Sequence, residues 1–165
     1  MVIKENLELE WEAAGTSIDS IKKMDDGILK KIERSGCKNI YIGVESGSDK
    51  ILKRINKRIT RAEVISLNKK LKKYNFNLIY NFMVGFPGES NSDVRKTISM
   101  IYQLKNDNKN ANISPIYFYT PYPNTKMYGY AKSSGFVEPK DLSGWSNFEW
   151  RKINVPWASD KKYLK

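Results

Sequence analysis

The sequence predicts an α/β fold whose strands form a parallel sheet, and two observations lead to this expectation. Apolar runs typical of buried strands alternate along the chain with stretches of helical period. Two of these runs, Ile40–Val44 and Asn81–Val84, break into glycine and are followed by the carboxylates Glu45 and Glu89. Strand ends of this kind are typical of the C-terminal edge of a parallel sheet, where α/β proteins place their ligands.

Length and composition indicate one domain with a core of its own. The chain has 165 residues, of which 40% are hydrophobic and 12% aromatic, so disorder throughout is not expected. No apolar run approaches the roughly 20 residues of a membrane span, and the acidic start lacks the apolar stretch of a secretory signal. The single cysteine, Cys37, excludes an internal disulfide and suits a reducing compartment, so we expect a cytoplasmic protein.

The net charge of +11 admits two interpretations. A basic chain can bind nucleic acid, but here lysines spread along predicted helices dominate, without interleaved arginine and aromatic residues. A solvated surface is therefore the stronger interpretation, and RNA binding stays open as the weaker one. Because histidine is absent and cysteine occurs once, we expect no self-contained metal site and assign no catalytic residue.

The elements of the first half are expected in the following order. Leu7–Trp11 alternates apolar and polar residues, as a half-buried strand does. Asp25–Arg34 predicts a helix with acidic residues at its start, an apolar stripe, and Gly36 as the stop after it. The continuous apolar run Ile40–Val44 predicts a strand covered on both faces, and a short helix is expected to run from Ser48 through Ile55.

The second half continues the alternation. Thr60 opens a capping box with a glutamate three residues further on, which predicts the start of a helix. Phe76–Val84 is the next expected strand, Ser90 or Ser92 caps the next helix, and Ile113–Tyr119 is a further strand. The expected order is therefore β-α-β-α-α-β-α-β.

After Tyr119 the pattern changes to a proline-stiffened loop over 120–125 and a short helix from about Thr125 to Lys132 that ends at Gly135. We expect one domain over 1–158 and a tail over 159–165. The C-terminal extension of this domain is marked by four aromatic residues: Trp145, Phe148, Trp150 and Trp157.

The candidate site residues each have two interpretations. Glu45 and Ser46 at a strand end can bind a ligand ammonium or hydroxyl, or can equally form a polar terminus that caps the next helix. Lys57 lies twelve residues after Glu45 and could reach a ligand carboxylate, although such a lysine is more often a surface residue. Asn81 interrupts an apolar strand, and a buried amide needs a hydrogen-bond partner.

The turn Gly85–Glu89 is the more specific signal, because two glycines bracket Phe86-Pro87 and let the backbone lie against a flat ligand. The alternative is a tight strand-to-helix turn without a ligand. Met83, on the preceding strand, is by default a core residue. Cys37 is expected to be a small buried apolar residue, since nothing near it in the sequence would lower its pKa.

Taken together, these segments resemble the radical S-adenosylmethionine (radical SAM) superfamily. The resemblance is closest to the group with an Elp3/MiaB/NifB-type core, which includes cobalamin-binding members and methylthiotransferases. It runs from about Leu7 to Trp150 in the family's order and spacing. The residues that carry it are Ser35–Asp49, Leu52–Lys57, Asn81–Glu89, Thr120–Thr125, Gly144-Trp145 and Phe148–Trp150.

The resemblance implies a partial TIM-type (β/α) barrel, about strands 3–6 of a (β/α)6 core. In that family a [4Fe–4S] cluster on a CxxxCxxC loop reduces S-adenosylmethionine to methionine and a 5′-deoxyadenosyl radical. In that family, the residues at the positions of Glu45 and Lys57 contact the cofactor's methionine moiety. The residue at the position of Asn81 contacts its ribose, and those at Met83 and near Phe118 flank its adenine. The implied cofactor-binding residues are Glu45, Ser46, Lys57, Asn81, Met83, Gly85 and Phe118.

The sequence also departs from the family, since no CxxxCxxC occurs in it and one cysteine cannot ligate a cluster. The cluster is expected in a parent protein and not on this chain. We therefore expect the C-terminal half of a radical SAM core, a fragment or truncated form that binds S-adenosylmethionine and is inactive alone. The alternatives are a non-catalytic nucleotide- or S-adenosylmethionine-binding module and a basic RNA-binding protein. Because a half barrel exposes strand edges, the expected partners include a second copy or the missing N-terminal half.

Overall fold

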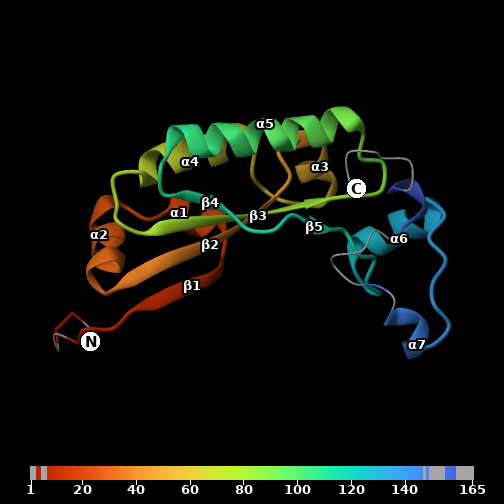
Figure 1. Cartoon of the computed structure of the whole chain (residues 1–165), viewed down its shortest axis with the longest axis horizontal. Coiled ribbons are helices and arrows are strands. Elements are labelled where there is room, and N and C mark those ends of the chain that lie inside the picture. Colours follow the sequence, from red (N-terminus) through yellow and green to blue (C-terminus); the bar gives the residue numbers. More distant parts are fainter. Residues whose placement is uncertain (1–2, 5–6, 147, 149–154, 159–165) are drawn as a thin grey trace.

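The computed structural model describes the chain except for residues 1–2, 5–6, 147, 149–154 and 159–165. A parallel sheet forms its centre, with helices along one side (Figure 1). All strand pairs are parallel, in the order β1-β2-β3-β4, and β5 extends the pairing at the end of β3. The strands are β1 (Trp11–Thr16), β2 (Cys37–Glu45), β3 (Asn77–Val84), β4 (Ala111–Ile113) and β5 (Tyr117–Phe118).

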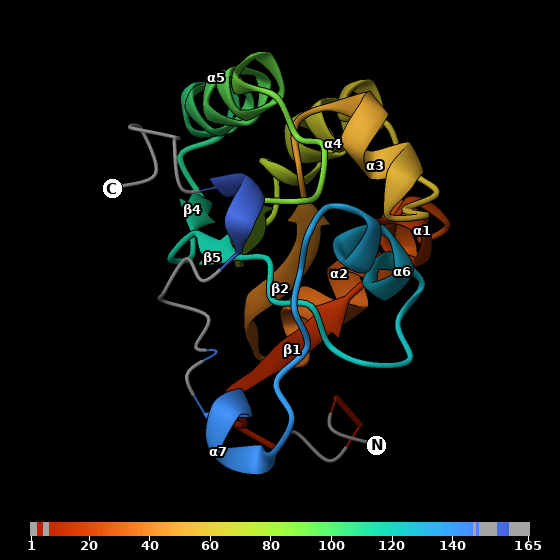
Figure 2. The ribbon, with the colours of Figure 1, turned by 90° about the vertical axis from the view of Figure 1, so that its right-hand side faces the viewer.

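Helices make every connection between successive strands from β1 to β4, which confirms the predicted α/β class. Figure 2 shows them along the outer side of a curved sheet whose inner face they leave open, as in part of a (β/α) barrel. The connecting helices are α1 (Ile18–Lys22) and α2 (Asp26–Arg34) before β2, α3 (Asp49–Arg54) and α4 (Arg61–Leu71) before β3, and α5 (Asn91–Asp107) before β4.

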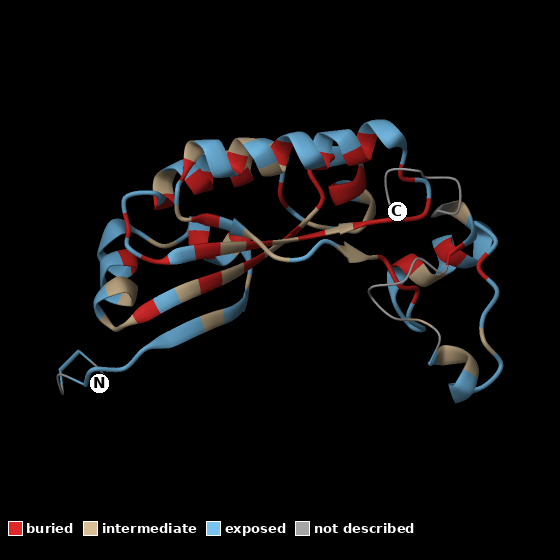
Figure 3. Cartoon of the chain, viewed as in Figure 1, coloured by how far each residue is buried: buried red, intermediate tan, exposed pale blue. Residues whose placement is uncertain are grey.

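The main core lies between the sheet and these helices. Burial alternates along β2 and β3, because successive side chains of a strand point to opposite faces (Figure 3). The outward residues of β2 and β3 are buried against apolar residues of α2, α4 and α5, whereas the inward residues are half-buried or exposed. The outward set is Ile40, Ile42, Val44, Leu78, Tyr80 and Phe82.

Three helix starts agree with the capping signals in the sequence. The Asp25 side chain accepts a hydrogen bond from the Ile28 backbone N–H at the start of α2. Thr60 forms the predicted capping box at α4, and Ser90, not Ser92, forms one at α5. These caps satisfy backbone donors that the first turn of a helix leaves free.

The first strand differs from the prediction. It spans Trp11–Thr16 instead of Leu7–Trp11, and Leu7 and Leu9 are exposed. The reason is the register: Trp11 pairs with Cys37, the first residue of β2, so residues before Trp11 have no strand beside them. The prediction failed because the Ala13-Ala14-Gly15 stretch has low strand propensity and no alternation of polar and apolar residues.

The predicted strand Ile113–Tyr119 is also corrected, since it divides into β4 and β5. Pro115 lies between them and has no backbone N–H to donate to β3, so the ladder is interrupted there. Helix α1 was not predicted. Its signal was Ser17, whose side chain caps the helix by accepting from the Ser20 backbone N–H.

A second apolar cluster lies at the C-terminal edge of the sheet. There α6 (Lys126–Ser133) packs against α3 and the turn after β3, and α7 (Leu142–Trp145) and a 3₁₀ turn at Pro156–Ala158 follow. Trp145, Phe148 and Trp157 pack against this cluster as partly buried residues. The fourth aromatic residue singled out in the sequence, Trp150, and the tail 159–165 lie outside the described residues. Across the described ranges, no helix is long and apolar enough to cross a membrane.

Candidate ligand-binding site

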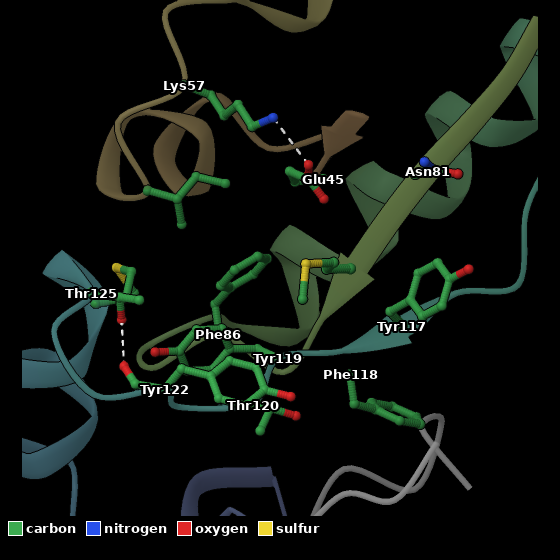
Figure 4. A pocket seen from close by; sticks show the side chains of 13 residues that line it. Glu45, Lys57, Asn81, Phe86, Tyr117, Phe118, Tyr119, Thr120, Tyr122 and Thr125 are labelled. Carbon is green, nitrogen blue, oxygen red and sulfur yellow. Dashed lines mark hydrogen bonds and ion pairs between the residues drawn. The ribbon is translucent and has the colours of Figure 1, made fainter. Parts of the chain in front are cut away.

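A pocket of about 510 Å³ opens where β2 and β3 end. One wall is polar, with Glu45, Lys57 and Asn81, and the opposite wall is aromatic (Figure 4). The aromatic wall comes from the turn after β3 and from β5 with the loop after it. Its residues are Phe86, Tyr117, Phe118, Tyr119 and Tyr122.

Glu45 owes its position to an irregular strand end. The register between β2 and β3 shifts between Gly43 and Glu45, and Glu45 has a φ of 73°, which is rare for a residue other than glycine. This bulge turns the last residue of β2 toward the pocket, and the carboxylate is only partly exposed there. Glu45 is therefore held in a conformation that costs free energy, as often found at binding sites.

Lys57 returns to the end of β2 from the far side of α3. Asn56 has a φ of 59°, and the Lys57 backbone N–H donates to the Leu52 carbonyl at 2.9 Å, so the chain turns back sharply after the helix. The Lys57 ammonium lies 3.0 Å from Glu45 Oε1 and donates to the Gly43 carbonyl at 3.1 Å. A Cβ on Gly43 would lie 2.8 Å from Glu45 Oε1, so only glycine leaves room for this pair.

Asn81 and Met83 lie on the open face of β3 and line the pocket. Asn81 pairs in register with Gly43, so its amide lies one strand away from the Glu45–Lys57 pair. Its side chain is half-buried. Met83 pairs in register with Tyr117 of β5 and packs, partly buried, against the second apolar cluster. It is therefore partly a core residue, as expected by default, and partly a residue of the pocket wall.

The Gly85–Glu89 turn shapes the pocket without Gly85 lining it. Gly85 has a φ of 83°, its N–H donates to Glu89 Oε2 at 2.6 Å, and its carbonyl accepts from Trp157 Nε1 at 2.9 Å. On the outer side of the turn, Arg54 donates to the Pro87 carbonyl at 2.7 Å. Among the turn's residues, Phe86 lines the pocket, and Phe118 of β5 lines it as well.

Ser46 does not lie in the pocket. It is fully buried behind the end of β2, where its hydroxyl lies 3.3 Å from Thr97 Oγ1 of α5 and accepts from the Ser48 N–H. The contrast with Glu45 follows from the strand period, which sends neighbouring side chains to opposite sides. The structure thus brings together five of the seven candidate residues and leaves Ser46 and Gly85 outside the lining.

The seven candidate residues do not include the side of the pocket formed after β5, although Thr120–Thr125 is among the segments that carry the resemblance. Tyr119, Thr120, Tyr122, Thr125 and Met127 line it. Tyr119 is buried, and burial raises the pKa of its hydroxyl. The proline-stiffened loop over 120–125 was the available signal, because it holds these side chains against the strand ends.

The residues of this chain do not fit an iron–sulfur cluster. Ligation needs three or more converging thiolates, and the sequence contains one cysteine. Cys37 is buried at the start of β2, and burial raises the pKa of its thiol, which makes it a poor ligand. Over the described ranges, no group of three histidine, cysteine, aspartate or glutamate side chains is placed to hold a metal ion.

A curved parallel sheet, outer helices and a pocket at the C-terminal strand ends are typical of part of a (β/α) barrel with a candidate ligand site. The profile described as the Radical SAM superfamily matches residues 1–101. The chain belongs to this superfamily. The resemblance noted in the sequence is thereby confirmed at the level of the family.

Curated relatives support the same family. The chain is 31% identical over 134 residues to an uncharacterized methyltransferase of Pyrococcus horikoshii, covering 81% of this chain and 27% of that protein. It is 40% identical over 76 residues to a tRNA-2-methylthio-N(6)-dimethylallyladenosine synthase of Ehrlichia ruminantium, covering 45% of this chain and 17% of that protein. The chain therefore spans about a quarter or less of the length of these relatives.

Two solved structures share the fold. The radical S-adenosylmethionine methyltransferase TsrM from Kitasatospora setae, solved with cobalamin and a [4Fe-4S] cluster bound, matches with a TM-score of 0.53 and 17% identity, over 68% of this chain and 22% of that one. The cobalamin-dependent S-adenosylmethionine radical enzyme OxsB, solved with aqua-cobalamin, matches with a TM-score of 0.53 and 22% identity, over 79% of this chain and 18% of that one. Both likenesses support the partial-barrel fold.

Proposed function

We propose that the pocket between the ends of β2 and β3 binds S-adenosylmethionine, and that this chain supplies one wall of a radical SAM core. The observation that carries the proposal is the Glu45–Lys57 pair, 3.0 Å apart, facing an aromatic wall across a pocket of about 510 Å³. A zwitterionic amino acid joined to a flat nucleoside requires this combination of charges at one end and apolar rings at the other.

The residues fit the cofactor group by group. The Glu45 carboxylate suits an ammonium or the sulfonium, and the Lys57 ammonium suits the cofactor's carboxylate. The Asn81 amide can both donate to and accept from ribose hydroxyls. Met83 and the rings of Phe86 and Phe118 provide apolar contact for adenine.

We further propose that this chain acts as the C-terminal half of such a core and performs no radical chemistry by itself. In this superfamily, S-adenosylmethionine is a radical source once a reduced cluster is beside it. The cluster needs thiolates that one cysteine cannot provide, so the role of this chain is to bind and orient the cofactor. The match covers 27% of the methyltransferase's length, which supports assigning to this chain a part of such a core and not the whole of it.

The edge strand β1 offers a route for that completion. Of the described strands it pairs only with β2, and four of its six residues are exposed. An unpaired edge is a template for another strand. We propose that this edge pairs with the N-terminal half of the core or with a second copy. Sedimentation of the purified chain alone and with such a partner tests this proposal. A chain that sediments as a monomer in both samples would refute it.

Chemical-shift mapping tests the pocket itself. Titration of the ¹⁵N-labelled chain with S-adenosylmethionine should shift the backbone amides of Glu45, Lys57 and Asn81 and the amides along β5. S-adenosylhomocysteine and adenosine serve as matched probes that lack the sulfonium or the amino-acid part. Adenosine should shift the aromatic side without the Glu45–Lys57 side. Shifts confined to the lysine-rich helices, or none at all, would reject the proposal.

A further inference from the structure

One buried carboxylate joins the two loops that carry the pocket. Asp93, in the first turn of α5, has a side chain that is 3% exposed. Its Oδ2 accepts from the Ser90 N–H at 3.0 Å and the Ser90 hydroxyl at 2.6 Å, on the loop after β3. Its Oδ1 accepts from the Ser48 hydroxyl at 2.7 Å, on the loop after β2. Lys50 adds an ion pair at 3.1 Å.

The Asp93–Ser48 bond is not required by either helix. The capping box of α5 uses only Ser90 and Asp93. Ser48 is the N-cap of α3, yet its side chain makes no capping bond to that helix and donates to Asp93 instead. A serine at this position ordinarily caps its own helix. The Ser48 hydroxyl therefore links the loop after β2 to Asp93 instead of capping α3.

The rest of the β2 loop lies directly on α5. The Gly47 N–H donates to Thr97 Oγ1 at 2.9 Å, and a Cβ on Gly47 would lie 2.7 Å from both Lys96 O and Thr97 Cα. Ser46 and Ser48 are fully buried beside it. The segment 46–48 is therefore fixed to α5 both by hydrogen bonds and by a close backbone approach.

This attachment follows Glu45 immediately in the chain. Glu45 has the unfavourable φ of 73°, and such a conformation persists only where the surroundings fix it. The residues that fix it on the C-terminal side are the ones attached to α5. Without the attachment, we expect Glu45 to relax toward ordinary extended backbone, which moves its carboxylate away from Lys57 and from the pocket.

We propose that Asp93, acting through Ser48, is a positioning residue that holds Glu45 and its partner Lys57 in the geometry that binds the cofactor. The inference rests on the proposed function for the ligand, but its structural part does not depend on the ligand. Asp93 does not line the pocket, so its effect on affinity passes through the loop after β2.

Two matched variants separate positioning from stability, since each removes one hydroxyl that donates to Asp93. Ser48→Ala cuts the connection between the loops and leaves the α5 capping box intact. Ser90→Ala breaks the capping box and leaves the Ser48 bond. Both proteins are compared with wild type by thermal unfolding, by amide hydrogen exchange at Gly47 and Glu45, and by S-adenosylmethionine titration at a temperature where all are folded.

We expect both variants to lose stability. Only Ser48→Ala should lose exchange protection at Gly47 and shift the Glu45 and Lys57 resonances. It should also bind S-adenosylmethionine about tenfold or more weakly than wild type. Equal affinity for the two variants, or unchanged Glu45 resonances in Ser48→Ala, would overturn the proposal. If wild type does not bind S-adenosylmethionine, the proposed function fails, and the ligand-free exchange and resonance data still decide the positioning role. Should Ser48→Ala not fold, Ser48→Gly removes the same hydroxyl at an N-cap position that tolerates glycine, and the same two outcomes apply.

Discussion

The Lys57 ammonium lies 3.0 Å from Glu45 Oε1 and also donates to the Gly43 carbonyl two residues earlier on β2, at 3.1 Å. The contact closes a loop in which the chain leaves β2, passes through α3 and returns to the same strand end. It exists because Gly43 has no side chain on the open face of the sheet and because Asn56 turns the chain back.

Gly43→Ala is expected to displace the Glu45–Lys57 pair while leaving the fold in place. The new Cβ would lie 2.8 Å from Glu45 Oε1 and 3.4 Å from Lys57 Nζ, and both are the ends of flexible side chains that can move at little cost. We predict a stability change below about 1 kcal/mol, measured by urea unfolding, together with about tenfold weaker S-adenosylmethionine binding.

Gly129→Ala provides the matched control, because Gly129 lies within α6 and a Cβ there meets nothing within 4 Å. It should stabilise the chain by about 0.5–1 kcal/mol through helix propensity and leave binding unchanged. Wild-type affinity in Gly43→Ala would show that the pair takes no part in binding.

Tyr80→Phe should lower stability without affecting the pocket. The Tyr80 ring is fully buried and its hydroxyl donates to Asn68 Oδ1 at 3.1 Å, on the helix-covered face of β3. Asn68 Oδ1 also accepts from Asn108 Nδ2 at 3.2 Å, so loss of the Tyr80 hydroxyl leaves this oxygen with one hydrogen-bond donor. We predict a decrease of about 1 kcal/mol in the free energy of unfolding.

The comparison for Tyr80 is Tyr102→Phe, since Tyr102 on α5 is 66% exposed and should change stability by less than about 0.5 kcal/mol. Urea denaturation of the two variants side by side gives the measurement. Equal stability of both variants would mean that the buried hydroxyl contributes nothing.

Acid sensitivity should report on Asp93. Burial alone would raise the pKa of this carboxyl, but hydrogen bonds from Ser90 and Ser48 and the nearby Lys50 ammonium outweigh burial and hold the pKa well below its ordinary value. A depressed pKa in the folded state contributes stability that is fully present above the unfolded value of about 3.9 and is lost as the pH falls below it.

Asp93→Asn should therefore be less stable than wild type at pH 7, with a difference that stays constant down to about pH 5 and then shrinks toward pH 2. Chemical denaturation across this range measures it. The lowered pKa values of Asp26, Glu63 and Glu138 affect both proteins and cancel in the difference. A difference that grows on acidification would contradict the assigned sign.

Anaerobic reconstitution with iron and sulfide should leave the chain without a stoichiometric cluster, because Cys37 is its only cysteine. Iron analysis after desalting is expected to give well below the roughly four irons per chain of a [4Fe–4S] centre. Cys37→Ser serves as the control and should bind as little iron. Stoichiometric iron in wild type would require ligands other than thiolates.

The sequence was most informative where local chemistry and the fold agree. The capping box at Thr60, the apolar run of β2 and the glycine turn after β3 were all predicted from a few residues each. The first strand was missed because parallel pairing with Cys37, a long-range contact, decides its position. Pro115 divided the last predicted strand, although a proline inside a strand pattern was itself a warning.

The candidate site was predictable to a similar extent. Of the seven residues that the resemblance implied as cofactor-binding, Glu45, Lys57, Asn81, Met83 and Phe118 line one pocket, and their contact with the cofactor stays a prediction. Ser46 was also expected at the site but lies outside the pocket lining, because only the pairing of β2 with β3 shows which side of the strand end faces the pocket. Tyr122 and Thr125 belong to the loop over 120–125 that carries part of the resemblance, but they lie far along the chain from Glu45, and no local pattern shows that they share a pocket with it.

Calorimetric titration of S-adenosylmethionine into the full chain, with Glu45→Gln and Lys57→Met beside wild type, tests the central claim most directly. Each substitution removes one charge of the pair and keeps much of the side-chain volume. We predict saturable one-to-one binding by wild type and about tenfold or greater weakening in each variant, with folding unchanged by circular dichroism. No binding by wild type, or equal binding by all three proteins, would contradict the assignment of this pocket.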